Sequence, residues 1–180
     1  MKILFISDIH GIDINLNLIE NIIEKEKIDK FVVLGDLYYA GPSYNKIYKV
    51  NSNNVKNILT KYSSKIICLK GNCDSEVDIK ASDFPICDNL ALIHIDGLDI
   101  YLTHGNEYNM KNNSKFNKNG ILIYGHEHIP YIKRHEKMIY INVGSISLPK
   151  DNNKATYMIY ENKRFTIYDI DKKIVDYIDL

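Results

Sequence analysis

The chain of 180 residues is poor in arginine, cysteine and proline, and it has no tryptophan. Arg134 and Arg164 are the two arginines among 23 basic residues, and 23 acidic residues bring the formal net charge to zero. Binding a nucleic-acid duplex or an anionic membrane through surface charge requires a clear excess of basic residues. The composition therefore argues against a long nucleic-acid duplex and against a membrane surface as partners.

Long apolar runs and paired cysteines are also missing. The apolar run at residues 3–6 ends far short of the roughly 20 residues that a transmembrane helix needs, and too early for a secretory signal. Cys68, Cys73 and Cys87 do not make an even disulfide framework, which favours a reducing compartment. We therefore expect a cytoplasmic protein in which Cys68 and Cys87 are buried or half-buried thiols.

The first half of the chain alternates short apolar runs with amphipathic stretches. Residues 3–6, 31–34 and 66–69 are predicted as strands, and residues 14–23 and 47–59 as helices, with a short polar segment after the third strand. This alternation is typical of a parallel sheet covered by helices.

From residue 90 onward the pattern changes to closely spaced strands, which predicts a second sheet. Asp96-Gly97 lies between the apolar runs 90–95 and 98–102 and is a strong hairpin signal. Further strands are predicted at residues 121–124, 131–133, 139–142, 155–160, 165–170 and 174–178. The stretch 108–119 is the most loop-like, and residues 110–116 are compatible with one short helix. Without a Pro-rich linker or a long block of charge, we expect a single domain over residues 1–180.

Five polar clusters follow predicted strands, each at the point where a strand should end. They are Asp8-Ile9-His10-Gly11, Gly35-Asp36, Gly71-Asn72-Cys73-Asp74, Thr103-His104-Gly105 and Gly125-His126-Glu127-His128. In open α/β sheets, ligand-binding and catalytic groups gather outside the carboxyl ends of the strands, so clusters distant in sequence can converge there.

These clusters supply two carboxylates, four imidazoles and one amide. The candidate metal ligands are Asp8, His10, Asp36, Asn72, His104, His126 and His128. Mixed nitrogen and oxygen donors suit Mn²⁺, Fe²⁺ or Zn²⁺ better than Ca²⁺. Seven ligands are too many for one structural zinc, but they suffice for two ions if one carboxylate bridges them. The positive charge of two ions would also explain how a phosphate-binding protein manages with so little arginine.

In order and spacing, the motifs Asp8-x-His10, Gly35-Asp36, Gly71-Asn72-x-Asp74, His104-Gly105 and Gly125-His126-x-His128 resemble the calcineurin-like metallophosphoesterase superfamily. Gly71-Asn72-Cys73-Asp74-Ser75-Glu76 and Asn142-Val143-Gly144-Ser145 resemble in particular its short YfcE-type phosphodiesterases. The likeness extends over residues 1–150.

The resemblance implies a four-layer α/β/β/α sandwich of the metallo-dependent phosphatase type with a dinuclear centre. The first ion would be held by Asp8, His10, Asp36 and His128, and the second by Asp36, Asn72, His104 and His126, so that Asp36 bridges the two. A hydroxide shared by the ions would attack the phosphorus of a small phosphoester, because metal binding lowers the pKa of water toward about 7. Mn²⁺ is the first choice of metal, with Ni²⁺, Zn²⁺, Fe²⁺ and Mg²⁺ as alternatives, and a homo-oligomer is compatible with the sequence.

Two positions depart from the family pattern. The residue after the metal-binding asparagine is usually a histidine that touches the phosphate or assists the leaving group, whereas here it is Cys73, and a thiol cannot supply an imidazolium. Relatives often carry a histidine two places after His104, where this chain has Asn106. We therefore consider Asp36, Asn72 and Cys73 as catalytic candidates, with the role of Cys73 in doubt, and Cys73 and Asn106 as candidate substrate contacts.

Two other interpretations compete with a hydrolase. A eukaryotic retromer subunit resembles the same subfamily and is thought to serve assembly more than hydrolysis, so the chain could be an interaction scaffold with residual metal binding. The polar residues of the clusters could also be ordinary helix caps and turn residues, although five clusters in the family order disfavour this. A complete ligand set favours a metal-dependent phosphodiesterase over a scaffold.

Overall fold

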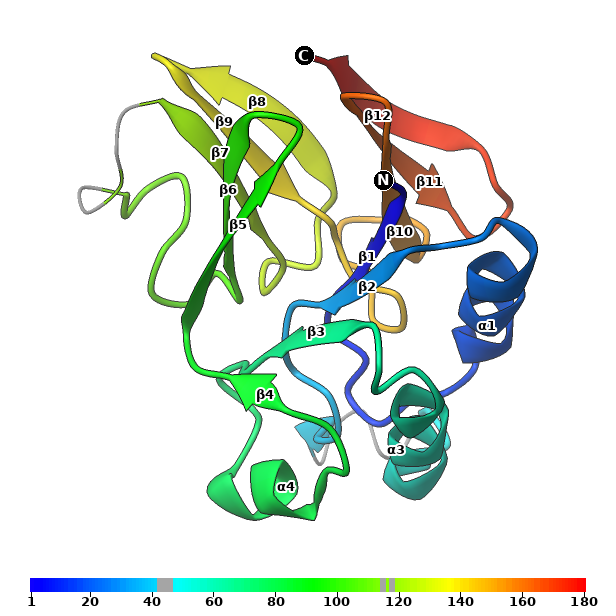
Figure 1. The fold of residues 1–180 in the computed structure, drawn as a ribbon. Helices are drawn as coiled ribbons and strands as arrows, with labels where there is room; N and C mark the ends of the chain where they lie inside the picture. The colour runs from blue at the N-terminus through cyan, green and yellow to red at the C-terminus, as the bar shows by residue number, and fades with distance from the viewer. Residues whose placement is uncertain (42–46, 114–115, 117–118) are drawn as a thin grey trace.

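A computed structural model describes residues 1–41, 47–113, 116 and 119–180, and it places two β-sheets face to face (Figure 1). The larger sheet has the strand order β12-β11-β10-β1-β2-β3-β4. Its strands are β1 (Ile3–Ile6), β2 (Lys30–Val33), β3 (Ile66–Leu69), β4 (Ile86–Cys87), β10 (Thr156–Glu161), β11 (Arg164–Asp169) and β12 (Ile174–Asp179). The smaller sheet has the order β5-β6-β7-β9-β8. Its strands are β5 (Leu90–Ile95), β6 (Leu98–Thr103), β7 (Gly120–Tyr124), β8 (Tyr131–His135) and β9 (Met138–Asn142).

Each sheet has a parallel centre and antiparallel additions. Strands β1 to β4 run parallel to one another, and β10, β11 and β12 extend that sheet in antiparallel fashion. The expectation that these last three strands belong to the second sheet is wrong, because β10 pairs with the free edge of β1. In the smaller sheet β6, β7 and β9 are parallel, and β5 and β8 are antiparallel edge strands. The predicted polar clusters follow β1, β2, β3, β6 and β7, so every one of them leaves a parallel strand at its carboxyl end.

The hydrophobic core lies in two layers, one on each face of the larger sheet. On β1, Ile3 and Phe5 point between the two sheets, whereas Leu4 and Ile6 point toward the helices. Because both faces of this strand are covered, its four residues are all apolar and all buried. The sheet is thus a rigid base for the loop that follows β1.

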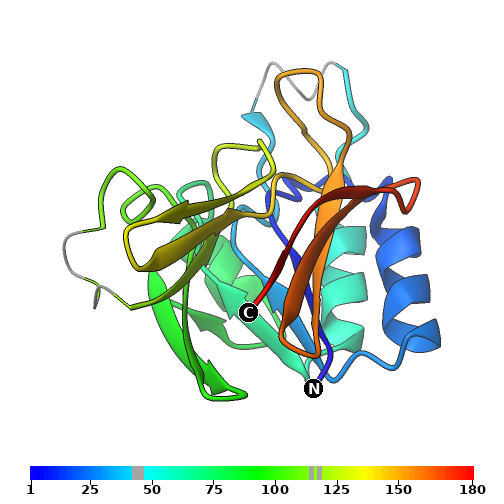
Figure 2. The same cartoon turned by 90° about the horizontal axis from the view of Figure 1, so that it is seen from above.

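Helices α1 (Leu16–Lys25) and α3 (Ser52–Lys61) lie side by side on the outer face of the larger sheet (Figure 2). The apolar stripe of α1 faces the sheet, as its spacing predicts, and α3 buries Val55, Ile58 and Leu59. The second helix begins at Ser52, later than predicted, because the Asn51 side chain accepts a hydrogen bond from the Asn54 N–H and caps it there.

The outer face of the smaller sheet is covered by the chain that follows β6. Met110 and Phe116 from this segment pack against Leu122 and Tyr124. Over residues 109–112 the backbone forms a turn closed by two hydrogen bonds between Asn109 and Asn112, so the predicted helix at 110–116 is absent from the described part of this segment; residues 114 and 115 lie outside it. The four-layer arrangement is confirmed, with a loop as its outer layer here.

Three features differ from the sequence-based expectation. Helix α4 (Glu76–Ala81) was not predicted, although Ser75 and Asp78 form a capping box that marks its start. Strand β4 is two residues long, and its Cys87 is exposed rather than buried or half-buried, because β4 is an edge strand. Cys68, in the middle of the sheet, is buried as predicted. Among the described helices none is long and apolar enough to cross a membrane.

Candidate metal centre

The structure brings the loops after five parallel strands to one place. Asp8 and His10 follow β1, Asp36 follows β2, and Asn72 and Cys73 follow β3 of the larger sheet; His104 follows β6, and His126 and His128 follow β7 of the smaller sheet. The smaller sheet therefore contributes three imidazoles, and the larger sheet contributes both carboxylates.

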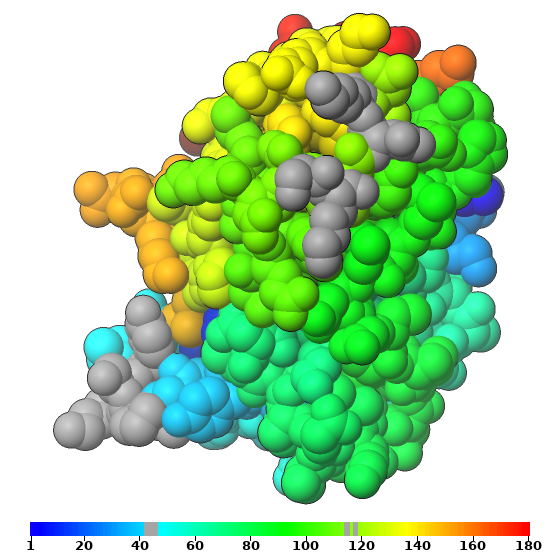
Figure 3. Space-filling view, turned by 90° about the vertical axis from the view of Figure 1, so that its left-hand side faces the viewer, coloured from blue at the N-terminus to red at the C-terminus, as the bar shows by residue number. Residues whose placement is uncertain are grey.

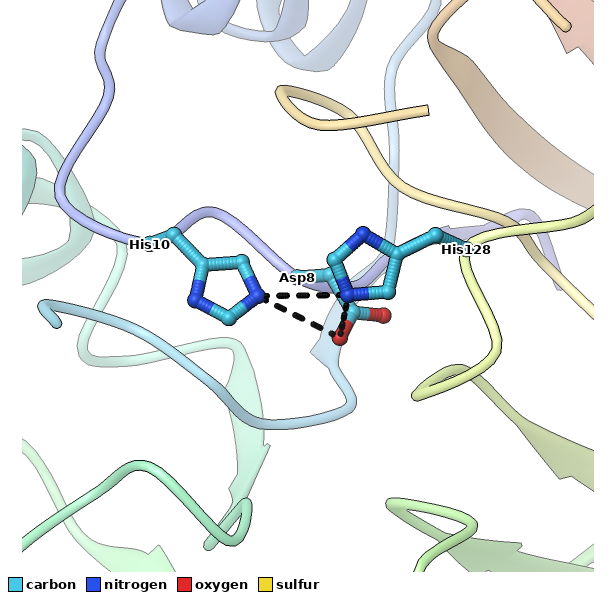
Figure 4. Close-up of side chains that lie close together, drawn as sticks. All are labelled: Asp8, His10 and His128. Atoms are coloured by element: carbon cyan, nitrogen blue, oxygen red, sulfur yellow. Dashed lines mark hydrogen bonds and ion pairs between the residues drawn. The ribbon is translucent and has the colours of Figure 1, made fainter. Parts of the chain in front are cut away.

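Three of these side chains form a tight buried group (Figure 4). The Asp8 Oδ1 atom lies 3.3 Å from His128 Nε2 and 3.7 Å from His10 Nε2, and the two Nε2 atoms lie 3.3 Å apart. All three residues are at most 6% exposed. Their ligand atoms are close enough together to bind one metal ion.

A second group forms around Asp36. Its Oδ2 atom lies 3.4 Å from His104 Nε2 and 3.5 Å from His10 Nε2, so one oxygen faces both groups. The Asn72 Oδ1 atom lies 3.0 Å from His104 Nε2, and the His126 ring centre is 5.1 Å from that of His104. The second group thus collects one oxygen from each of the loops after β2 and β3 of the larger sheet, together with two imidazoles of the smaller sheet.

Backbone carbonyls fix which ring nitrogen of each buried histidine points inward. The Nδ1 atoms of His10, His104 and His128 lie 2.7, 2.7 and 2.5 Å from the carbonyl oxygens of Tyr39, Leu34 and Leu148. A carbonyl oxygen can only accept, so each Nδ1 carries the proton and each Nε2 is left to the centre. This hydrogen bond is the usual support of a metal-binding histidine.

A divalent metal fits these residues. Asp8 Oδ2 accepts a hydrogen bond from the His126 backbone N–H, whereas the buried Oδ1 has no hydrogen-bond partner among the residues that the structure describes. A buried carboxylate oxygen without a donor is costly unless a cation faces it. A cavity of about 290 Å³ opens above the group; among the residues that line it are His10, Asp36, Asn72, Cys73, His126 and His128.

Comparisons with known proteins agree with this geometry. The calcineurin-like phosphoesterase superfamily domain matches residues 1–164. The chain belongs to this superfamily. It is 33% identical over 165 residues to the phosphodiesterase YfcE of Escherichia coli K12, covering 90% of this chain and 88% of that protein.

The solved structure of the E. coli phosphoesterase YfcE has the same fold. It superposes with a TM-score of 0.92 at 30% identity and covers 99% of this chain and 98% of that one. Vps29 from Entamoeba histolytica is more distant, with 18% identity, a TM-score of 0.65 and coverage of 100% of this chain and 99% of that one. At that distance the likeness shows the fold alone, and it does not favour a scaffold.

This phosphoesterase holds most of its candidate metal ligands in a strained backbone conformation. Asp8, His10, Asp36, His126 and His128 all have φ between 53° and 63°, the left-handed region that non-glycine residues rarely adopt. Such strain costs of order 1–3 kcal/mol per residue and persists only where the surrounding structure enforces it. The periodicity of the strands does not predict this left-handed backbone conformation.

Asp74 holds the site loops together, a role that its sequence pattern alone does not predict. Its buried carboxylate accepts hydrogen bonds from the backbone N–H groups of Asp36, Leu37 and Gly71, at 2.7–2.8 Å. It therefore ties the loop after β2, which carries Asp36, to the loop after β3, which carries Asn72. Its position within the Gly71-Asn72-x-Asp74 motif was the signal that could have identified it.

The motif at residues 142–145 is hydrogen-bonded to the loops around the candidate centre. Ser145 Oγ donates to the Asp8 carbonyl oxygen at 2.8 Å and accepts from the Leu148 N–H at 2.7 Å. Asn142 Nδ2 donates to the Gly125 carbonyl oxygen at 2.7 Å. These bonds connect the loops that carry Asp8, His126 and His128, so the motif holds the candidate ligand loops in place rather than acting as an ordinary turn.

In the metal-free centre, protonated imidazoles balance the negative charge of the Asp8 and Asp36 carboxylates. Burial disfavours the charged form of His104, but the hydrogen bond to Asp36 and the charges of Asp8 and Asp36 outweigh it and raise the pKa of His104 to about 9. The pKa of His10 is raised in the same way, against its burial, mainly by Asp8. Burial raises the pKa of Asp8, but the nearby imidazoles of His10, His128 and His104 outweigh it, so the pKa is lowered overall. Burial and the charge of His104 lower the pKa of His126.

We expect metal binding to release protons. His104, with a pKa of about 9, carries a proton at pH 7 that a metal ion must displace. Affinity for Mn²⁺ should therefore rise between pH 6 and pH 9, and calorimetric titrations in buffers of different ionisation enthalpy should show release of about one to two protons at pH 7. The same proton stabilises the metal-free fold below about pH 6.5, and that contribution is lost as the pH rises through about 9. Binding without proton release would contradict these pKa directions.

The two candidate substrate contacts differ in position. Cys73 lines the cavity, and its thiol accepts a hydrogen bond from Asn72 Nδ2 at 3.3 Å. Burial, together with the Asp36 carboxylate, raises the pKa of Cys73 to about 12, so the thiol is neutral at pH 7. Asn106 is exposed and is not among the described residues that line this cavity, so its contact with substrate stays a prediction.

Proposed function

We propose that this protein is a metal-dependent phosphodiesterase that hydrolyses a small phosphoester at a centre of two divalent ions, with Mn²⁺ as the first choice of metal. The observation that carries the proposal is the position of Asp36. A single carboxylate oxygen lies within 3.5 Å of His10 Nε2 and of His104 Nε2, which belong to the two separate groups. One oxygen that faces both ligand groups can bridge two ions, while the other oxygen of the carboxylate stays hydrogen-bonded to the protein.

We assign Asp8, His10, Asp36 and His128 to one ion and Asp36, Asn72, His104 and His126 to the other. Two ions held by these residues would lower the pKa of water and neutralise the charge that develops on phosphoryl oxygens. The 33% identity to a phosphodiesterase supports this chemistry for the chain. The cavity of about 290 Å³ suits a phosphoryl group better than a long polymer.

The protein's own groups keep these ligands in place while substrate binds. The backbone N–H of His126 holds Asp8 Oδ2, and the backbone N–H of Cys73 holds Asp36 Oδ1 at 2.8 Å. Each carboxylate is therefore fixed through one oxygen and leaves the other for the centre. Such preorganisation avoids the cost of reorienting the ligands during the reaction.

Metal-depleted protein, reconstituted with Mn²⁺, Ni²⁺, Zn²⁺ or Mg²⁺, tests the proposal. We expect hydrolysis of bis(p-nitrophenyl) phosphate that depends on the added metal, with Mn²⁺ giving the highest rate, and p-nitrophenyl phosphate measured in parallel compares diester with monoester. The absence of metal-dependent turnover on both compounds with every metal would overturn the proposal and favour the scaffold.

The thiol at position 73 leads to a separate expected result. Because a neutral thiol with a pKa of about 12 is a poor proton donor, departure of an alkoxide should be unassisted. We expect Cys73→His to raise kcat on a dithymidine monophosphate by roughly tenfold or more, with a much smaller gain on bis(p-nitrophenyl) phosphate, whose phenolate leaves without a proton. Cys73→Ser is the control of similar size. Equal gains on both substrates would contradict a leaving-group effect.

We also propose that residues 1–180 work as one domain in the cytoplasm. The last strands, β11 and β12, extend the same sheet that begins with β1, which supports a single unit. The three cysteines are free thiols, which supports a reducing compartment. The zero net charge supports a small phosphoester, rather than a long duplex, as the partner.

A further inference from the structure

A second, larger cavity adjoins the candidate metal centre. It has a volume of about 690 Å³ and is lined by residues of β8, of the loop after β7 and of the segment after β6. His126 and Lys150 line both this cavity and the one above the metal ligands, so the two spaces share a wall. Figure 3 looks onto this side of the molecule, where the orange loop near residue 150 projects beside the yellow-green segment that follows β7.

The residues that line this second cavity carry more positive than negative charge. Of the described residues that line it, Lys111, Lys133 and Lys150 are basic, and Glu127 alone carries a carboxylate. The Glu127 carboxylate lies 3.4 Å from Asn142 Nδ2. In a chain with no net charge, three lysines around one space create a local positive field of the kind that attracts a second anionic group.

The apolar part of the wall is flat and firmly held. Tyr131 contributes its ring, and its hydroxyl is hydrogen-bonded to that of Tyr124, which also accepts from the Met110 N–H at 3.3 Å. Lys133 Nζ stands 4.5 Å from the centre of the Tyr131 ring. Met110 and Ile129 complete the apolar wall. An aromatic ring with an ammonium group beside it suits a compact, partly apolar ligand group that carries negative charge.

We propose that this cavity binds the second arm of the substrate and that this arm carries its own phosphate or carboxylate group. The inference rests on the proposed function, because it takes the phosphodiester at the metals as its starting point. The scissile phosphate lies at the metal ligands, Lys150 stands where the two cavities meet, and Lys111 and Lys133 receive the additional anion. The substrate class is thus a small diester with at least one further anionic group, rather than a neutral diester.

Equilibrium binding to the Mn²⁺-loaded protein tests the inference without any turnover. We compare thymidine 3′,5′-bisphosphate with thymidine 5′-monophosphate by calorimetry, since the two probes differ by one phosphate. The bisphosphate should bind about tenfold more tightly, and the ratio should fall as salt is raised from 50 to 500 mM because these charges are open to solvent. Affinities within twofold of each other would overturn the inference.

Lysine substitutions test where the second phosphate binds. The double variant Lys111→Ala/Lys133→Ala should reduce the ratio to below about 2, whereas Lys137→Ala, an exposed lysine in the turn between β8 and β9, should leave it unchanged. A preference that survives the double variant would show that the second phosphate binds elsewhere and would overturn the assignment.

Measurements of turnover distinguish a failure of this inference from a failure of the proposed function. The p-nitrophenyl ester of thymidine 5′-phosphate and its 3′-phosphorylated form share one leaving group, and we expect the second to have a KM about tenfold lower. Metal-dependent hydrolysis of both esters with equal KM values would overturn the inference alone. Tighter binding of the bisphosphate with no hydrolysis of any ester would overturn the proposed function alone.

Discussion

Replacing Asp36 by asparagine should lower kcat on bis(p-nitrophenyl) phosphate by roughly 10³-fold or more while leaving the fold intact. The asparagine Oδ1 can keep the hydrogen bond from the Cys73 N–H, and asparagine tolerates the left-handed backbone at φ 55°. Its amide nitrogen then takes the place of Oδ2, so two N–H donors face the Nε2 atoms of His10 and His104. An amide nitrogen has no lone pair to offer a cation, and the bridging position is lost.

The same substitution should also reduce the number of bound metal ions. Metal analysis after dialysis should show fewer ions per chain than in the wild type, with far-UV circular dichroism and the urea midpoint little changed. Asp99→Asn is the matched control, because Asp99 is exposed and pairs with His94 on the surface, away from the centre. Full activity and full metal content in Asp36→Asn would contradict the bridging assignment, and equal losses in Asp99→Asn would show that the effect is unspecific.

Periodicity and turn chemistry were enough to predict most of the strands, but not which sheet each strand joins: β10, β11 and β12 were expected in the second sheet and extend the first one instead, because a strand's period does not say which edge it pairs with. Strand β1 is a short, fully apolar run, and the hairpin between β5 and β6 follows from Asp96-Gly97, whose φ values of 53° and 81° are those of a tight turn. Such signals are local, so they need no knowledge of the rest of the fold. The short strand β4 was missed because two residues cannot show a period.

The candidate site could be predicted because its ligands sit directly after strands. A strand end fixes where a loop begins, so His104 after β6 and Asp36 after β2 meet once the sheets face each other. The supporting contacts could not be predicted. The three N–H groups bound by Asp74 and the carbonyls that orient the histidines depend on how separate loops pack, and the cavity with its three lysines depends on how the segment after β6 covers the smaller sheet.

Introducing a methyl group at Gly35 should destabilise the metal-free protein by roughly 3 kcal/mol or more. Gly35 has a φ of +98°, and a Cβ there would lie 2.6 Å from Gly71 N, 2.7 Å from Gly71 Cα and 2.9 Å from His104 Nδ1. Two of these atoms belong to backbone that Asp74 holds in place, so they cannot move aside without breaking the Gly71 hydrogen bond. The third belongs to a ligand whose Nδ1 is 2.7 Å from the Leu34 carbonyl oxygen.

Gly97→Ala separates the cost of crowding from the cost of backbone strain. Gly97 also has a positive φ, of +81°, but a Cβ there meets nothing within 4 Å, so its substitution should cost only about 1–2 kcal/mol. Urea unfolding of both metal-free variants measures the difference without any contribution from metal binding. Gly35→Ala should in addition bind metal more weakly than Gly97→Ala, because the added methyl group pushes His104 away from Asp36. Equal stabilities of the two variants would mean that the loops after β2 and β3 yield to each other, and that the centre is not held by the close approach of Gly35 to Gly71.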